Sequence, residues 1–163
     1  KYGYLLADDK MAKISEGRGD YLSKASLLCI DAFKVNEKGF FMMIEGSQID
    51  WGGHANNATS VITETLDFDK ALGAVLDFAE KDGNTLVIVT ADHETGGFTL
   101  KAKDKKVPFG GLRGDYNEID PAFSTRGHSA TMVPVLAYGP GQELFSGIYQ
   151  NTEIHKKIME LVK

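Results

Sequence analysis

Cysteine is almost absent from this sequence. Cys29 is the only cysteine among 163 residues, so no internal disulfide can form, and cysteine usage does not indicate the cellular compartment. Cys29 lies in the apolar run of residues 27–30, and we expect it to be a small core residue rather than a reactive thiol.

Long apolar runs and an excess of positive charge are also missing. No run reaches the length of about 18 residues that a membrane-spanning helix needs, so we expect no membrane span. Lys and Arg total 18 against 23 Asp and Glu, and the lysines are scattered, which argues against a nucleic-acid partner. No signal peptide is visible, but the sequence begins at Lys1 rather than at methionine, which is compatible with removal of an upstream portion.

The length and the patterning that are present predict one α/β domain over residues 1–163. Helices and short apolar strands alternate along the chain, and the strands are apolar on both faces, as buried parallel strands are. The expected helices cover residues 20–35 (capped by Asp20), 57–80 and a last segment capped by Asn151, and the expected strands cover Phe40–Ile44, Thr85–Thr90 and Pro134–Pro140.

Residues 99–127 have a different character. They are polar and rich in glycine, with few periodic apolar positions. A loop of this length in a compact domain is usually functional, so we interpret the segment as a lid or a mobile insertion.

Three short motifs carry candidate metal ligands. Asp50 and His54 are four residues apart and share a face if this turn is helical. Asp92 and His93 follow an apolar strand, and His128 comes later in the chain. Five such ligands suit two zinc ions, since zinc takes histidine nitrogen and carboxylate oxygen. Any one of them alone is more often a solvated loop residue, but five together make that reading improbable.

Three further residues need separate interpretations. Glu45 ends a predicted strand and is either a solvated charge or a ligand for a hard cation such as magnesium. Trp51 is either a packing residue or a cleft residue, and the sequence leaves both open. His155, on the last helix, is expected at the surface.

The three motifs, read as Glu45-Gly-Ser-Gln-Ile-Asp50 with His54, Thr90-Ala-Asp-His93-Glu-Thr-Gly-Gly97 and Gly127-His-Ser-Ala130, resemble the alkaline phosphatase family. The resemblance implies Asp50, His54 and His128 as ligands of a first zinc, Asp92 and His93 as ligands of a second, and Glu45 as a ligand of magnesium. Trp51 stands where some family members carry a basic residue or histidine near the phosphate, which makes it the candidate substrate contact.

The sequence also departs from the family pattern. The family's serine nucleophile stands in an Asp-Ser-Ala context upstream of these motifs, and none of the serines here has that context. The aspartate that bridges the magnesium and the second zinc, and the phosphate-binding arginine, have no counterpart either. We therefore expect the C-terminal part of a doubly wound, mostly parallel sheet with helices on both faces, inactive without the nucleophile.

The resemblance implies a phosphomonoester substrate, a homodimer and a periplasmic or extracellular location. Two alternatives stay open. Another hydrolase of the same superfamily, a phosphodiesterase or a sulfatase, shares the metal ligands. A non-catalytic zinc-binding domain instead requires a fourth protein ligand on each ion, and no cysteine cluster offers one.

Overall fold

A computed structural model describes residues 6–8 and 10–162, and Lys1 lies outside them. The chain divides into two compact units. The first comprises Lys1–Gly46, Thr63–Asp92 and Val133–Lys163, and the second comprises Ser47–Ile62 and His93–Met132. The expectation of one domain over residues 1–163 stays a prediction.

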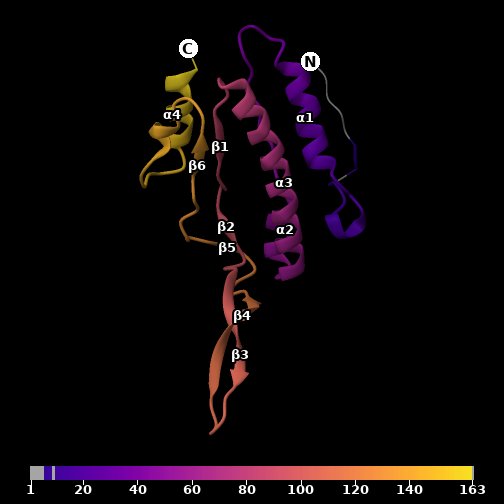
Figure 1. Cartoon of the computed structure of the whole chain (residues 1–163), viewed down its shortest axis with the longest axis vertical. Coiled ribbons are helices and arrows are strands. Elements are labelled where there is room, and N and C mark those ends of the chain that lie inside the picture. The colour runs from indigo at the N-terminus through magenta and orange to yellow at the C-terminus, as the bar shows by residue number, and fades with distance from the viewer. Residues whose placement is uncertain (1–5, 9, 163) are drawn as a thin grey trace. The chain divides into compact units, whose positions relative to one another are not determined.

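The α-helices of the first unit are close to those predicted (Figure 1), whereas its 3₁₀ helices were not predicted. The helices of this unit are the 3₁₀ helix η1 (Ile14–Glu16), α1 (Tyr21–Phe33), α3 (Ala58–Asp82, which begins in the second unit), the 3₁₀ helix η2 (Gln142–Phe145) and α4 (Glu153–Leu161). Asp20 does precede α1, but its carboxylate pairs with the Lys24 ammonium at 3.1 Å instead of capping the helix backbone. The predicted cap of α4 is wrong by one residue, because Thr152 and not Asn151 takes that position.

A buried ionic cluster fastens the segment before α1 to α3. The Arg18 guanidinium donates to the carboxylates of Glu64 and Asp67, at 2.9 Å for Asp67, and Glu64 also accepts from the Ile14 backbone N–H at 2.9 Å. All three charged side chains are more than nine-tenths buried. Burial alone would lower the pKa of Arg18, but its hydrogen bonds to Glu64 and Asp67 and their charges raise it overall.

The strands of the first unit differ from the prediction. Strand β1 (Val87–Val89) pairs antiparallel with β6 (Leu136–Tyr138), with Ile88 opposite Ala137, where a parallel strand was expected. The predicted strand Phe40–Ile44 is not a strand in the structure. An apolar, β-prone run indicates extension and burial, but a strand also needs a neighbour for its ladder, and the run does not identify one.

The face that α1 buries also differs from the prediction. Ser26 and Ile30, one turn apart, are buried, whereas Cys29 is exposed and is not a core residue. Residues 27–30 are apolar on every side of the helix, so their periodicity does not determine which side packs. Among the described residues, no helix combines the length and apolar character needed to cross a bilayer.

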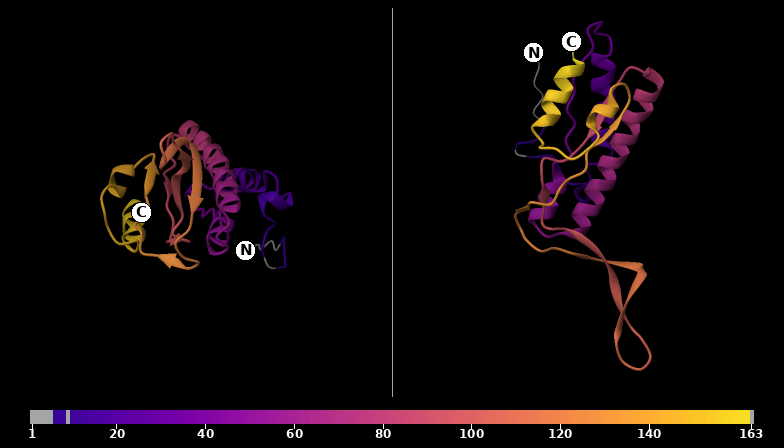
Figure 2. Two further views of the ribbon diagram at one scale, coloured as in Figure 1. Left: turned by 90° about the horizontal axis from the view of Figure 1, so that it is seen from below. Right: turned by 90° about the vertical axis from the view of Figure 1, so that its left-hand side faces the viewer.

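The second unit contains a short helix and two pairs of strands. They are α2 (Gln48–His54), β2 (Glu94–Thr95) paired antiparallel with β5 (His128–Ser129), and β3 (Thr99–Lys106) paired with β4 (Leu112–Ala122). Residues 99–122 therefore form a long hairpin rather than an unstructured loop (Figures 1 and 2). Exposed ion pairs link the two strands of the hairpin, such as Lys103 with Glu118 at 2.7 Å. Its predicted role as a lid stays a prediction.

Candidate metal centre

Helix α2 brings Asp50 and His54 onto one face, as their spacing predicts. The Nε2 atom of His54 lies 3.5 Å from Oδ2 of Asp50, and both side chains are 39% exposed. Asp50 lies in the first turn and His54 in the last turn of the helix. A carboxylate in the first turn of a helix is favoured by the helix dipole.

Two glycines let this short helix sit close to its neighbours. A Cβ atom on Gly53 would lie 2.6 Å from the Thr95 carbonyl oxygen, and one on Gly52 would lie 3.0 Å from the Val61 backbone nitrogen. Both glycines are buried. The glycine pair is thus a packing requirement that holds α2 against β2 and against the start of α3.

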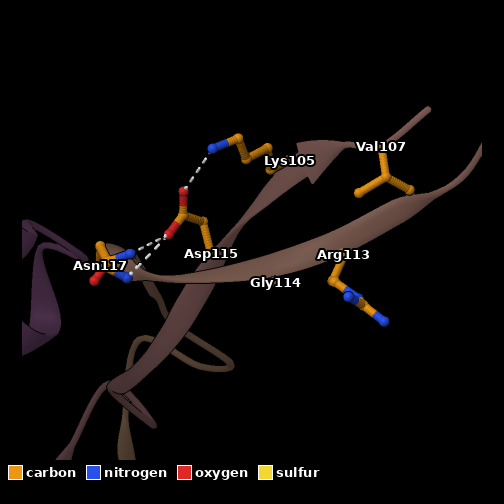
Figure 3. Close-up of a pocket in the computed structure, with 6 residues that line it drawn as sticks. All are labelled: Lys105, Val107, Arg113, Gly114, Asp115 and Asn117. Carbon is orange, nitrogen blue, oxygen red and sulfur yellow. Dashed lines mark hydrogen bonds and ion pairs between the residues drawn. The ribbon is translucent and has the colours of Figure 1, made fainter.

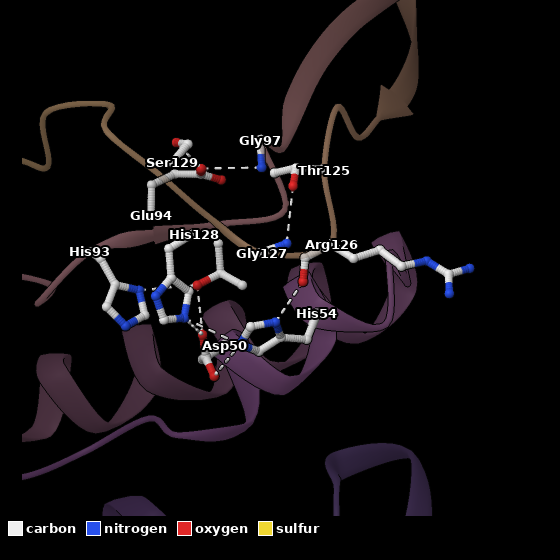
Figure 4. A network of polar contacts seen from close by, with 11 residues as sticks. Asp50, His54, His93, Glu94, Gly97, Thr125, Arg126, Gly127, His128 and Ser129 are labelled. Atoms are coloured by element: carbon white, nitrogen blue, oxygen red, sulfur yellow. Dashed lines mark hydrogen bonds and ion pairs between the residues drawn. The ribbon is translucent and has the colours of Figure 1, made fainter.

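Strand β5 places His128 opposite the helix. Its Nε2 atom lies 3.3 Å from Nε2 of His54 and 4.0 Å from Oδ1 of Asp50 (Figure 4). Two nitrogens bound to one tetrahedral zinc at about 2.0–2.1 Å lie about 3.3–3.4 Å apart. The separation between the two histidine nitrogens therefore fits a shared zinc ion.

A backbone carbonyl fixes the tautomer of His54. The Nδ1 atom of His54 lies 2.7 Å from the carbonyl oxygen of Arg126. A carbonyl only accepts, so Nδ1 carries the proton, and Nε2 keeps the lone pair that a metal requires. This is the arrangement in which the second ring nitrogen orients a ligating histidine.

His93 joins the same cluster. Its ring stacks on that of His128 with 3.5 Å between centroids and 20° between planes. Asp50, His93 and His128 each offer a ligand atom, and these atoms lie within 4.8 Å of one another. The sequence had grouped His93 with Asp92, whereas the structure brings it to Asp50 and His128.

A hydroxyl connects His93 to Asp50. Nδ1 of His93 lies 3.1 Å from Oγ1 of Thr95, and the same hydroxyl donates to Oδ1 of Asp50 at 2.6 Å. Thr95 was not a candidate from the sequence, although it lies within one of the three motifs.

Glu94 holds the loop beside the cluster. Its carboxylate accepts from the backbone N–H groups of Gly97 at 3.1 Å and Phe98 at 3.0 Å, and from the Ser129 hydroxyl. Burial alone would raise the pKa of Glu94, but the hydrogen bonds from Ser129, Phe98 and Gly97 lower it overall. Glu94 and Ser129 are a register pair of β2 and β5, so this contact reinforces the strand pair that carries His128.

The other residues considered from the sequence are Glu45, Asp92, Trp51 and His155. Glu45 and Asp92 are exposed and belong to the first unit, and their roles as ligands stay predictions. Trp51 on α2 is 50% exposed, so it is a surface-accessible residue rather than a buried packing residue. His155 on α4 is exposed, as predicted.

Two hollows on the surface of the described residues contain none of the converging histidines. A shallow hollow of about 220 Å³ on the hairpin is lined by Lys105, Val107, Arg113, Gly114, Asp115 and Asn117 (Figure 3). It contains none of the candidate ligands. The converging donor atoms therefore mark the site better than the shape of the surface does.

Comparison with known proteins decides the family. Residues 5–115 match the model of the family described as alkaline phosphatase. The chain belongs to the alkaline phosphatase family. It is 32% identical to alkaline phosphatase 4 of Bacillus subtilis (strain 168), covering 98% of this chain and 48% of the relative. The chain thus spans about half the length of the curated relative.

Solved alkaline phosphatases share its fold. The enzyme from the Antarctic bacterium TAB5 is 57% identical, with a TM-score of 0.90 over 97% of this chain and 45% of that chain. A mutant of the TAB5 enzyme with magnesium bound is 59% identical, with the same TM-score of 0.90. These matches confirm the predicted fold class, the truncated α/β fold of an alkaline phosphatase, although every strand pair described here is antiparallel.

Proposed function

We propose that this chain carries the metal-binding part of a metal-dependent alkaline phosphatase that hydrolyses phosphomonoesters. The observation that supports it is the convergence of Asp50, His54 and His128, with 3.3 Å between the two histidine nitrogens. The donor set suits zinc, because it combines imidazole nitrogen with carboxylate oxygen.

In this proposal Asp50, His54 and His128 hold the first zinc, Asp92 and His93 belong to the second, and Glu45 belongs to magnesium. Bound metal ions would stabilise the charge that develops on the attacking and leaving oxygens of phosphoryl transfer. The His54 and His128 side chains are 39% and 50% exposed, which leaves room for a substrate. Trp51, half-exposed on the same helix, is proposed as a substrate contact.

The 163 residues contain no serine in the Asp-Ser-Ala context of the family nucleophile. Without a covalent nucleophile the two-step path through an enzyme intermediate is closed. We therefore propose that this chain alone has little or no phosphatase activity, and that the activity belongs to a protein that also contains the nucleophile. The family also supports a homodimer in the periplasm or outside the cell.

One observation favours a second candidate. The ligand atoms of His93, Asp50 and His128 lie within 4.8 Å of one another, and Nε2 of His54 lies 3.3 Å from Nε2 of His128, so the second candidate is a site in which these four side chains bind one ion. A closed site of that kind is structural, whereas catalytic zinc keeps one position open. The number of zinc ions bound per chain separates the two candidates.

Calorimetric titration of zinc into the metal-free chain tests both. We expect two events, one tight and one much weaker, with His54→Ala abolishing the tight event. His155→Ala, on the exposed face of α4, is the matched control and leaves both events unchanged. One event with one zinc per chain, lost equally in His93→Ala and His54→Ala, would replace the proposal by the structural site.

The substrate class needs a protein that contains both this chain and the nucleophile. We expect it to hydrolyse p-nitrophenyl phosphate in preference to bis-p-nitrophenyl phosphate and p-nitrophenyl sulfate. A preference for the diester or the sulfate would instead assign it to another branch of the superfamily.

A further inference from the structure

We propose that Thr95 is a positioning residue that orients His93 and Asp50 together and so couples the two halves of the metal centre. The inference rests on the proposed metal-binding function. It concerns a hydroxyl that binds no metal itself but contacts a proposed ligand of each zinc.

Proton counting determines the direction of both hydrogen bonds. The Thr95 hydroxyl has one proton, and an ionised carboxylate only accepts, so the 2.6 Å contact uses that proton toward Oδ1 of Asp50. The 3.1 Å contact with His93 must then be a hydrogen bond from Nδ1–H to the Thr95 oxygen. His93 is thereby held as the tautomer whose Nε2 carries the lone pair.

The same hydroxyl sets the orientation of the Asp50 carboxylate. Thr95 binds Oδ1 of Asp50. The other oxygen of Asp50, Oδ2, faces Nε2 of His54 at 3.5 Å (Figure 4). Rotation of the carboxylate would break the short bond to Thr95. One side chain therefore fixes the rotation of the Asp50 carboxylate and the tautomer of the His93 ring.

Thr95 is itself held firmly. It pairs with His128 in the β2–β5 ladder, and its backbone packs against Gly53 of α2. Its branched side chain also has few rotamers available. The hydroxyl is therefore in place before a metal arrives, and its two hydrogen bonds need little further ordering.

The Arg126 carbonyl orients His54 in a comparable way, but it contacts only one proposed ligand. Thr95 serves one proposed ligand of each zinc. Loss of its hydroxyl should therefore weaken both binding events, whereas loss of a contact to one ligand should weaken one event.

The experiment compares Thr95→Val, which keeps the shape and removes the hydroxyl, with Thr95→Ser, which keeps the hydroxyl. Thr99→Val is the control, since its exposed hydroxyl reaches only the Ala122 carbonyl, at 3.4 Å. Two measurements are made on each full chain. Long-range ¹H–¹⁵N spectra of the metal-free chain report the histidine tautomers, and calorimetry reports zinc binding.

We expect the His93 ring to be protonated at Nδ1 in the wild type, in Thr95→Ser and in Thr99→Val, and to lose that preference in Thr95→Val. Both zinc affinities should fall by about 10–100-fold in Thr95→Val, the usual effect of losing an outer-shell partner. Thr95→Ser and Thr99→Val should bind as the wild type does. Circular dichroism of each variant establishes that it is folded.

Two results would overturn the inference. One is a Thr95→Val chain that is folded, keeps the Nδ1–H tautomer and binds both zinc ions normally. The other is equal weakening in Thr95→Ser, which would assign the effect to packing. If the wild type binds no zinc, the proposed function fails, and the tautomer spectra still decide whether Thr95 orients His93.

Discussion

At the scale of single residues, Glu94 shows how one carboxylate can organise the loop beside a site. It accepts from two backbone N–H groups and from Ser129, all within the second unit. Removing such an acceptor leaves these donors without a partner, which costs about 1–3 kcal/mol for a buried group. Because Glu94 is only partly buried, we expect the lower end of that range.

The lowered pKa of Glu94 makes its contribution depend on pH. A carboxyl whose pKa is depressed on folding stabilises the protein fully above its unfolded value, here the ordinary 4.5, and loses that contribution as pH falls through the folded value. We expect the stability gap between wild type and Glu94→Ala to be constant near neutral pH and to shrink below pH 4.5. Urea unfolding of both proteins across this pH range measures the gap. A gap that stays constant into acid would contradict the linkage.

The candidate ligands stood out in the sequence because their chemistry is unusual, and their roles as ligands stay a proposal. Histidine and aspartate side by side after an apolar strand stand out, and Asp50 with His54 needed only one helical turn to converge. Thr95, Glu94 and Ser129 could not be singled out in this way. Their hydrogen bonds depend on the pairing of β2 with β5, and threonine or serine in a loop is too common to signal a role.

At the scale of secondary-structure elements, two glycines in helices differ in why an alanine would change stability. At Gly53 the effect comes from packing, and at Gly73 it comes from helix propensity. Gly53 in α2 has no room for a side chain, since a Cβ atom would meet the Thr95 carbonyl oxygen at 2.6 Å, whereas Gly73 in α3 meets nothing within 4 Å. Alanine at Gly73 should stabilise the chain by about 0.5–1 kcal/mol, the usual helix preference. Alanine at Gly53 should destabilise it and weaken zinc binding, because α2 must move away from β2.

Chemical denaturation of the two alanine variants, with zinc titration of each, checks this contrast. Equal stabilisation by both would show that α2 adjusts to the added methyl at no cost. A loss of stability in Gly73→Ala would show that the outer face of α3 at this position is packed.

The buried ion pairs of Arg18 also hold two elements together, namely the segment before α1 and helix α3. Arg18→Met leaves Glu64 and Asp67 buried without their cation, which typically costs about 3–5 kcal/mol. Lys24→Met is the matched control. Its pair with Asp20 is exposed by 73% and 69%, and such a surface pair contributes little to stability. Urea midpoints measure both, and similar losses would contradict the buried cluster.

Helices were more predictable than strands. The periodic stripes located α1, α3 and α4, because a helix makes its hydrogen bonds within its own sequence. The run Phe40–Ile44 and the partner of β1 depend on segments distant in the chain, which local pattern does not contain. The hairpin of β3 and β4 was missed for another reason, since its polar strands lack the apolar alternation of a half-buried sheet.

At the scale of the whole molecule, apolar side chains on the surface are the feature that matters most. Val35, Phe41 and Met43 in the first unit are exposed by 77%, 67% and 81%. Large exposed apolar patches mark surfaces that associate. We expect the chain to self-associate at high concentration, in keeping with the proposed homodimer.

Light scattering over a dilution series measures this association. Replacing both Phe41 and Met43 by lysine should shift the equilibrium toward the monomer. Glu37→Lys changes the net charge by the same amount at an exposed position nearby and should leave association unchanged. A wild-type chain that stays monomeric throughout would show that these side chains do not associate.

The contact between His54 and the Arg126 carbonyl has a consequence for mutational tolerance. Every amino acid supplies that oxygen, so evolution can replace the side chain at position 126 without disturbing the imidazole. A saturation library selected for zinc binding should therefore accept many residues at 126 while rejecting most at Thr95. Position 126 would vary in sequence among descendants of this protein and would still be needed, because its backbone carbonyl makes the contact with His54.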